Sequence, residues 1–272
     1  MTAPLGLTWE AVSAAHVVDL AHRWERGMPV SPNHPAFQLA MMRRHGDMVR
    51  SDGGSAANEM LVLGGHVGTH LDALGHVSQD GLMYGGTEAA ASQSNHGLTA
   101  LGIETALPIF CRGVLLDVAE VHGVDVLDTG YEVTAEDLEA AEATAGVEVG
   151  EGDAVLIRTG WAIHWDNPDI FRGQVGGAPG PGEGAARWLA KRFIRVTGAE
   201  TIAYEVVRPG AGHATLPVHR ILLVEAGIHI IEVMDLSSLA TAGRHEFLFV
   251  AAPLKIVGGT GSPVRPLAII DG

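Results

Sequence analysis

The spacing of apolar residues predicts strands and helices that alternate through the middle of the chain. Short apolar runs bounded by turn residues indicate strands, whereas apolar residues that recur every three or four positions indicate helices. Strands are expected at residues 17–22, 113–118, 153–160, 201–204, 229–236 and 246–257. Helices are expected at residues 8–16, 134–144, 184–198 and 217–227. The pattern therefore predicts one α/β domain over residues 1–272, built on a mixed sheet.

Turn and capping residues refine these boundaries. Thr134 precedes Asp137 by three positions, which is the arrangement of a capping box at a helix start. Gly198 is expected to end the helix of residues 184–198. Residues 28–37 contain three prolines and are predicted to be a loop. Residues 173–184 are rich in glycine and proline and are predicted to form a long surface loop rather than a linker between domains.

The composition limits the class of protein. Hydrophobic residues make up 47% of the chain, which is enough for a sizeable core and too many for a disordered protein. The net charge is −15, and no cluster of basic residues suits a nucleic acid or an anionic membrane. The single cysteine, Cys111, allows no intrachain disulfide, and the N-terminal sequence lacks the features of a signal peptide. We expect a cytoplasmic protein that binds a small molecule, not a nucleic acid or a membrane.

One segment concentrates side chains that bind metals. In GGHVGTHLDALGHVSQDG (residues 64–81), only even intervals separate His66, His70, Asp72 and His76. In an extended chain this spacing places the side chains on one face, and the glycines permit tight turns. A zinc-protease helix of the H-E-x-x-H type is excluded, because no Glu lies between His66 and His70 and the glycines oppose a helix. Two imidazoles and a carboxylate suit Zn²⁺, Mn²⁺ or Fe²⁺.

Other kinds of chemistry have weaker support. The chain has 14 histidines, so some clustering by chance is expected. No G-x-S-x-G motif marks a serine nucleophile, and Cys111 precedes an apolar strand as a core cysteine would. The glycines of residues 176–184 lack the spacing of a nucleotide-binding loop. A protein that binds a metal without catalysis stays open. His66, His70 and Asp72 already supply the three ligands that a metal needs, so the additional His76 favours an enzyme.

The segment from His66 to His76 resembles the H-x-G-T-H-x-D-x-P-x-H signature of the "putative cyclase" family, with Leu74 in place of the proline. Residues 19–32, 158–161, 216–236 and 253–266 also resemble family segments, so the resemblance covers most of the chain. The family includes kynurenine formamidases and isatin hydrolases, which are metal-dependent amide hydrolases. The resemblance implies their fold, a swivelling β/β/α arrangement with a mixed, barrel-like sheet.

The resemblance also implies roles for individual residues. His66, His70 and Asp72 match the first metal-ligand positions, and His76 matches the proton donor and acceptor. His219 and Glu232 resemble the pair that holds a second ion together with the bridging aspartate, so one or two Zn or Mn ions per subunit are implied. Glu232 lies in an otherwise apolar strand, where a buried charge needs a metal or an arginine as partner. The alternative is that Glu232 points to solvent.

The reaction expected from this resemblance is the opening of a cyclic amide. A bound ion would lower the pKa of water, and the hydroxide would attack the carbonyl carbon. His76, titrating near neutral pH, would then pass the proton to the leaving nitrogen. His213 and His219 are candidates for orienting the tetrahedral intermediate.

Two departures from the kynurenine formamidases bear on the substrate. Ser31 stands where those enzymes usually carry a tryptophan that contacts the substrate, so Ser31 is expected to line the substrate site. The chain is also longer, and its ending resembles the isatin-hydrolase branch. Both points favour isatin, another imide or a bicyclic lactam, while N-formylkynurenine hydrolysis and a non-hydrolytic cyclase reaction stay open. The resemblance further implies a homodimer or homotetramer.

Overall fold

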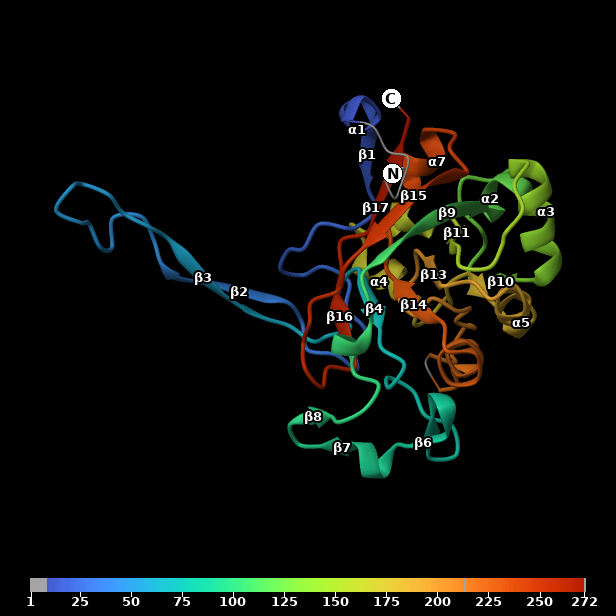
Figure 1. The fold of residues 1–272 in the computed structure, drawn as a ribbon, viewed down its shortest axis with the longest axis horizontal. Coiled ribbons are helices and arrows are strands. Elements are labelled where there is room, and N and C mark those ends of the chain that lie inside the picture. The colour runs from blue at the N-terminus through green and yellow to red at the C-terminus, as the bar shows by residue number, and fades with distance from the viewer. Residues whose placement is uncertain (1–8, 213, 272) are drawn as a thin grey trace, which may run out of the picture.

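The centre of the fold is a curled mixed sheet of nine strands, seen in a computed structural model that describes residues 9–212 and 214–271 (Figure 1). From one edge to the other, the strands are β1 (His16–Asp19), β17 (Leu267–Ile270), β15 (Glu246–Ala251), β9 (Ile109–Asp117), β11 (Ala154–Arg158), β13 (Val196–Ala199), β14 (His229–Glu232), β4 (His70–Asp72) and β16 (Gly261–Pro263). The neighbours β9, β11, β13 and β14 run parallel, and the outer pairs are antiparallel. The predicted mixed, barrel-like α/β fold is therefore confirmed.

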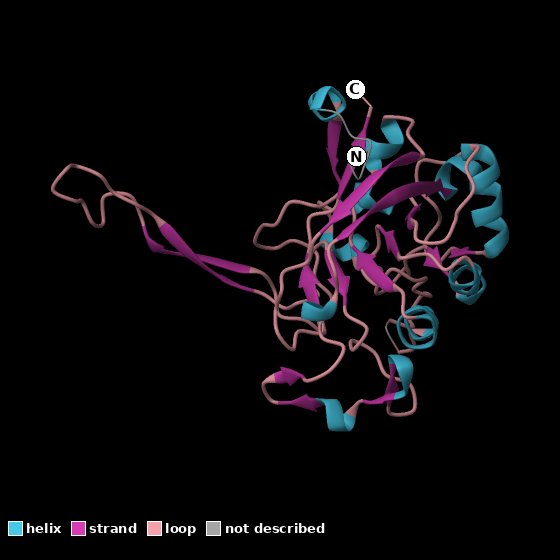
Figure 2. Ribbon diagram, viewed as in Figure 1, coloured by secondary structure: helices cyan, strands magenta, loops and turns pink. Residues whose placement is uncertain are grey.

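Helices cover one face of the parallel strands. The helices of the described chain are α1 (Trp9–Ala14), α2 (Val118–Val121), α3 (Ala135–Ala145), α4 (Pro168–Phe171), α5 (Glu183–Lys191), α6 (Pro217–His219) and α7 (Ser237–Thr241). A π-helix, η5 (Arg220–Ala226), continues α6, and short 3₁₀ turns are η1 (Tyr84–Gly86), η2 (Ala90–Ser92), η3 (Ile103–Thr105) and η4 (Trp161–His164). In Figure 2, α3 and α5 lie together on the right of the sheet.

Both faces of the central strands are buried, because successive side chains of a strand point in opposite directions. In β9, Val114 and Leu116 pack toward the helical layer, whereas Leu115 packs into the core on the opposite face. A third apolar cluster includes Val67, Trp161 and Val233 and lies beside the histidine segment. Burial on two faces explains why these strands appear in the sequence as continuous apolar runs.

Four two-stranded ribbons complete the fold, and one of them leaves the body. Strands β2 (Gln38–Arg43) and β3 (Asn58–Val62) form a long arm at the left of Figure 1. The other ribbons pair β5 (Leu82–Met83) with β6 (Thr87–Glu88), β7 (Gln93–Ser94) with β8 (Gly97–Leu98), and β10 (Glu132–Val133) with β12 (Gly180–Pro181). The pattern analysis did not predict the arm.

The capping prediction for α3 is confirmed in atomic detail. The Thr134 hydroxyl accepts from the Asp137 N–H at 3.2 Å, and the Asp137 carboxylate accepts from the Thr134 N–H at 2.9 Å. The predicted helices at 8–16 and 217–227 correspond to α1 and to α6 with η5, although Thr8 lies outside the described residues. Residues 28–37 contain no strand or helix, as predicted.

The helix predicted over residues 184–198 is present as α5 but ends seven residues early, and the strand predicted over residues 201–204 is wrong. Helix α5 ends at Lys191, and Phe193 adopts a positive φ of 53° that turns the chain. Residues 196–199 then form β13, in which Val196 pairs with Ala154 of β11. Gly198 lies inside this strand, where a Cβ would collide with the Met234 sulfur, so its role is close packing and not capping.

Candidate metal centre

The candidate ligands come together on the two neighbouring strands β4 and β14. His70 and Asp72 lie in β4, and both are buried. Glu232 of β14 is the direct cross-strand partner of His70 in the antiparallel register. Glu232 is also buried, so the solvent-facing alternative is wrong. His219, at the end of α6, is buried against the same group of side chains.

Turns, and not one extended strand, bring the outer two histidines into the cluster. Only residues 70–72 of the segment form a strand, while His66 and His76 lie in the turns before and after it. Gly68 has a φ of 60°, and a Cβ there would collide with the Trp24 indole, so the first turn requires glycine. The prediction of a single extended face is therefore wrong for His66 and His76.

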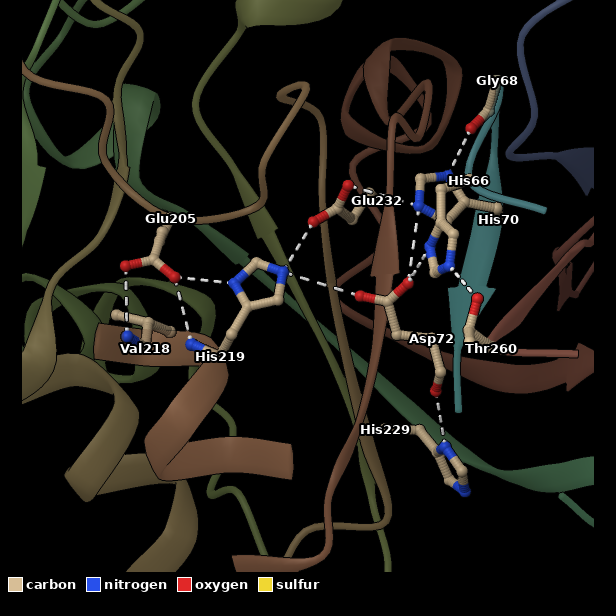
Figure 3. A network of polar contacts seen from close by, with 10 residues as sticks. All are labelled: His66, Gly68, His70, Asp72, Glu205, Val218, His219, His229, Glu232 and Thr260. Carbon is tan, nitrogen blue, oxygen red and sulfur yellow. Dashed lines mark hydrogen bonds and ion pairs between the residues drawn. The ribbon is translucent and has the colours of Figure 1, made fainter. Parts of the chain in front are cut away.

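Asp72 lies at the centre of the cluster (Figure 3). One carboxylate oxygen, Oδ1, lies 2.8 Å from His66 Nδ1 and 3.5 Å from His70 Nε2. The other, Oδ2, lies 3.6 Å from His219 Nε2. Glu232 closes the arrangement, with Oε2 at 3.3 Å from His70 Nε2 and Oε1 at 3.0 Å from His219 Nε2. Asp72 thus presents one oxygen to His66 and His70 and the other to His219.

Two overlapping sets of side chains have the spacing of metal ligands. One set is His66, Asp72 and His76, and the other is His70, Asp72 and Glu232. This grouping differs from the predicted one, in which His66 and His70 share an ion and His76 binds none. The His76 ring stacks on the His66 ring with centroids 3.9 Å apart, so His76 lies within the cluster itself.

Buried hydrogen bonds orient each imidazole from behind. His70 Nδ1 donates to the Gly68 carbonyl at 2.7 Å, and His219 Nδ1 donates to the Glu205 carboxylate at 2.6 Å. His66 Nε2 lies 2.8 Å from the Thr260 hydroxyl. A hydrogen bond at one ring nitrogen fixes the orientation of an imidazole, so that its other nitrogen can face a metal.

Sequence reasoning did not find Glu205 or Thr260, because both lie far along the chain from the rings that they contact. Thr69, which directly precedes His70 in the sequence, does not take this role. The Thr69 hydroxyl in fact donates to the Val233 carbonyl and accepts from the His22 N–H. Thr69 therefore holds the backbone beside the cluster and does not touch a histidine ring.

The chemistry of the cluster fits a divalent cation. Asp72 and Glu232 are buried carboxylates within one group, and a buried charge is costly without a counter-charge. Two buried atoms that face the group, His70 Nε2 and Asp72 Oδ2, have no hydrogen-bond partner among the described residues. Unpaired buried nitrogen and carboxylate atoms are what a metal would satisfy.

The protonation state of His219 also indicates that the cluster suits a cation. Burial alone lowers the pKa of His219, but the neighbouring carboxylates of Asp72, Glu205 and Glu232 raise it well above the ordinary value. The protein therefore places positive charge at this position when only its own side chains are present. A cation beside Asp72 and Glu232 would take over this role.

The protonation behaviour of His76 differs from the one expected from the sequence. Burial lowers the pKa of His76 to about 4, an effect that the nearby Asp72 only partly offsets. The ring is thus neutral at pH 7 and can accept a proton, whereas the sequence suggested titration near neutrality. His34, which sequence reasoning did not single out, also lies at the cluster, with its ring centroid 5.3 Å from that of His66. The other predicted catalytic histidine, His213, lies outside the described residues.

Ser31 lies in the loop that leads to the cluster. Ser31 is only 4% exposed, and its hydroxyl has no hydrogen-bond partner among the described residues. It lines a cavity of about 130 Å³ together with Pro32, Asn33, Arg172, Gln174, Ile202, Val207 and Gly212. The Ser31 carbonyl accepts from the His34 N–H at 3.0 Å, which ties this cavity to the loop beside His66.

A model of the family described as "Putative cyclase" matches residues 18–206. The chain belongs to this cyclase family. Among curated proteins, this cyclase-family chain is similar to an isatin hydrolase from Roseibium aggregatum, with 29% identity over 81% of this chain and 77% of that protein. The predicted family resemblance is confirmed.

Solved structures resemble the chain over nearly its whole length. A structure described as a novel cyclase has 30% identity and a TM-score of 0.83, covering 96% of this chain and 93% of its own. Isatin hydrolase A from Labrenzia aggregata, bound to benzyl benzoate, shares the fold with 23% identity and a TM-score of 0.74, covering 96% of both chains. A "predicted metal-dependent hydrolase" from Bacillus stearothermophilus has 25% identity and a TM-score of 0.59, covering 94% of this chain and 98% of its own.

These comparisons and the cluster together support the expected class of enzyme, a metal-dependent hydrolase of the cyclase family. Among the described helices, none is long and apolar enough to cross a bilayer.

Proposed function

We propose that this cyclase-family protein hydrolyses cyclic amides, using water activated at the centre formed by His66, His70, Asp72, His219 and Glu232. The observation that carries the proposal is the position of Asp72, whose two oxygens face different imidazoles inside a buried cluster. Histidine and carboxylate ligands of this kind suit Zn²⁺ or Mn²⁺. When bound, such an ion polarises a carbonyl oxygen and lowers the pKa of water.

His76 moves the proton in this proposal. Its neutral ring accepts a proton from the attacking water as the oxygen–carbon bond forms. It then returns the proton to the amide nitrogen as the carbon–nitrogen bond breaks, so that the nitrogen leaves as a neutral amine. The stacking of His76 on His66, at 3.9 Å between centroids, keeps the ring at the cluster.

The substrate class rests on the cavity and on the named relative. Ile202 and Val207 offer apolar contact in the cavity beside Ser31, whereas Asn33 and Gln174 offer amide groups. A planar cyclic amide has apolar faces and a polar edge, which matches such a lining. The similarity to isatin hydrolase supports the same class.

The test is mass spectrometry of amide substrates incubated with the protein, with and without a chelator. The panel contains isatin, a bicyclic γ-lactam, a cyclic imide and N-formylkynurenine. We expect a product heavier than a cyclic substrate by one water, and its loss on chelation. His76→Ala should slow formation of the product by about 10²–10⁴-fold, whereas His96→Ala, which removes an exposed histidine, should not.

The other outcomes separate the alternatives. Cleavage of N-formylkynurenine into two pieces, with no ring opening, would identify a formamidase. Metal binding without turnover of any amide would refute the hydrolase proposal and favour a cyclase or a metal-binding protein.

A further inference from the structure

The polar side chains of the cavity beside Ser31 can all donate hydrogen bonds. They are the hydroxyl of Ser31, the amides of Asn33 and Gln174, and the guanidinium of Arg172. None of the described residues that line the cavity is acidic, although the chain as a whole has a net charge of −15. Arg172 is the one charged residue among them. Within an acidic protein, this cavity is therefore complementary to an anionic group.

The Ser31 hydroxyl lacks a partner that a bound group could supply. Ser31 is only 4% exposed, and no described residue forms a hydrogen bond with its Oγ. Leaving a buried polar group unpaired is costly, so buried hydroxyls in folded proteins normally have a partner. An acceptor oxygen that enters the cavity would provide it.

Arg172 has hydrogen-bond donors to spare. A guanidinium carries five N–H groups, and the one side-chain partner of Arg172 among the described residues is the carboxylate of Asp169. The Asp169 side chain is 90% exposed, and an ion pair with so exposed a partner contributes little. A ligand carboxylate inside the cavity is less screened by water, so its charge-assisted hydrogen bonds to Arg172 are stronger. Asp169 is thus a partner that a ligand can replace.

The backbone on both sides of Arg172 is held in place. The preceding residue, Phe171, is buried, and its carbonyl accepts from Trp161 Nε1 at 3.0 Å. The following residue, Gly173, has a φ of 62°, and a Cβ there would lie 2.9 Å from Cβ of Ala178. The fixed backbone limits where the guanidinium can reach, which reduces the entropy lost when a ligand binds.

The cavity lies next to two segments of the candidate metal centre. Ser31 accepts a hydrogen bond from the backbone of His34, whose ring centroid lies 5.3 Å from that of His66. Ile202 packs in the same apolar cluster as Val233, the residue that follows the buried carboxylate of β14. The volume of about 130 Å³ is below the roughly 300–1,000 Å³ of pockets that enclose a whole ligand. The cavity therefore suits one end of a substrate.

We propose that Arg172 and Ser31 bind a carboxylate that the substrate carries at a distance from the amide that is opened. This assignment rests on the proposed function, because it concerns the part of the substrate that lies away from the metal centre. Water still adds to the amide carbonyl carbon as the carbon–nitrogen bond breaks, which yields a new carboxylate and an amine. The distant carboxylate takes no part in these bond changes. A planar guanidinium binds a carboxylate through two parallel hydrogen bonds, so the preferred substrate is a cyclic amide that is also an acid.

The first experiment measures binding without turnover. Isothermal titration calorimetry compares indole-5-carboxylate with indole-5-carboxamide, neither of which has a cyclic amide to open. We expect the wild-type protein to bind the carboxylate about 10- to 100-fold more tightly. Arg172→Met should remove this preference. The control Arg187→Met, which removes an arginine that pairs with Glu225 on the surface, should keep it. Equal affinity of the wild-type protein for the two ligands overturns the proposal.

The variant Asp169→Asn provides a second test if Arg172→Met does not fold. It changes an exposed side chain and frees the guanidinium of Arg172 from its partner. The carboxylate should then bind more tightly than it does to the wild-type protein, whereas the affinity for the carboxamide should not change. Unchanged or weaker binding of the carboxylate contradicts the proposal.

Turnover separates this proposal from the hydrolase activity on which it rests. Ring opening of isatin-5-carboxylate and isatin-5-carboxamide is followed by mass spectrometry in the presence of Zn²⁺ or Mn²⁺. Arg172→Met should raise KM for the carboxylate by about 10- to 100-fold and leave kcat unchanged, because the lost contact is equal in the ground state and the transition state. Equal kcat/KM of the wild-type protein for both substrates overturns the carboxylate site and leaves the hydrolase proposal intact. Preferential binding of indole-5-carboxylate with no ring opening of any amide supports the carboxylate site and refutes the hydrolase proposal.

Discussion

Glu205→Gln isolates the contribution of a buried carboxylate that touches the metal centre only through His219. Glu205 is buried, and its Oε1 accepts from the His219 N–H at 3.0 Å and from His219 Nδ1 at 2.6 Å. Its Oε2 accepts from the Val218 N–H at 3.1 Å. Glutamine has nearly the same shape but is neutral and has one accepting oxygen instead of two.

The substitution is therefore expected to lower both the stability of the fold and the affinity for a metal. If the amide oxygen keeps the position of Oε1, the amide nitrogen faces the Val218 N–H, and one buried donor loses its partner. That loss should lower the free energy of unfolding by about 1–3 kcal/mol. Loss of the negative charge makes His219 a poorer ligand, which typically weakens metal binding by about 10- to 100-fold.

The assay measures these two costs independently. Urea unfolding of the metal-free protein gives the change in stability, and competition with a chromogenic chelator gives the affinity for Zn²⁺ or Mn²⁺. The control is Glu225→Gln, at a partly exposed residue of η5 that pairs with Arg187 and Arg220 on the surface. Surface pairs contribute about 0–1 kcal/mol, so the control should retain metal affinity. Normal metal affinity in a destabilised Glu205→Gln would refute the role of Glu205 in orienting a ligand.

Three further predictions address the centre and the core. His76→Ala should retain metal and lose about 10²–10⁴-fold in rate; loss of bound metal, measured by elemental analysis, would make His76 a ligand instead. Removal of metal should lower the free energy of unfolding by about 2.7 kcal/mol relative to the protein at a metal concentration of 100 times Kd, and unchanged denaturation curves would contradict a metal held by the folded protein. Burial raises the pKa of Glu200 from 4.5 to about 7, although Thr159 and Arg158 oppose the shift. Because the folded state then binds the extra proton, stability should fall as pH rises between these values. Glu200→Gln should remove up to roughly 3 kcal/mol of this fall in urea titrations, and an unchanged slope would show that the carboxyl stays ionised.

Local signals predicted the elements whose ends are encoded in adjacent residues. The capping box of Thr134 and Asp137 specifies the start of α3 without any tertiary contact. The predicted end of α5 was wrong because the true end depends on a tertiary contact, the pairing of Val196 with β11. This pairing outweighs the apolar spacing from which a longer helix was predicted. The arm was missed because its apolar residues lie on both faces of a ribbon and show no single period.

In the candidate metal centre too, local sequence predicted some residues, whereas others depend on tertiary contacts. The segment from His66 to His76 carries most of the candidate ligands within eleven residues, and its even spacing drew attention to them. The spacing did not predict the turns that bring His66 and His76 inward. Glu205 and Thr260 could not be predicted, because only the sheet and α6 bring them beside the rings of His219 and His66.

The position of β4 between β14 and β16 determines when the candidate metal centre can be completed during synthesis. Asp72 pairs with Gly261, and His70 pairs with Glu232, so both neighbours of β4 emerge from the ribosome long after the histidine segment. At typical rates of translation, β16 follows His76 by roughly 10–40 s. During that interval the nascent chain displays three histidines and an aspartate without the carboxylate and the sheet that fix their geometry. The arrangement of His70, Asp72 and Glu232 is therefore a property of the completed fold and not of the growing chain.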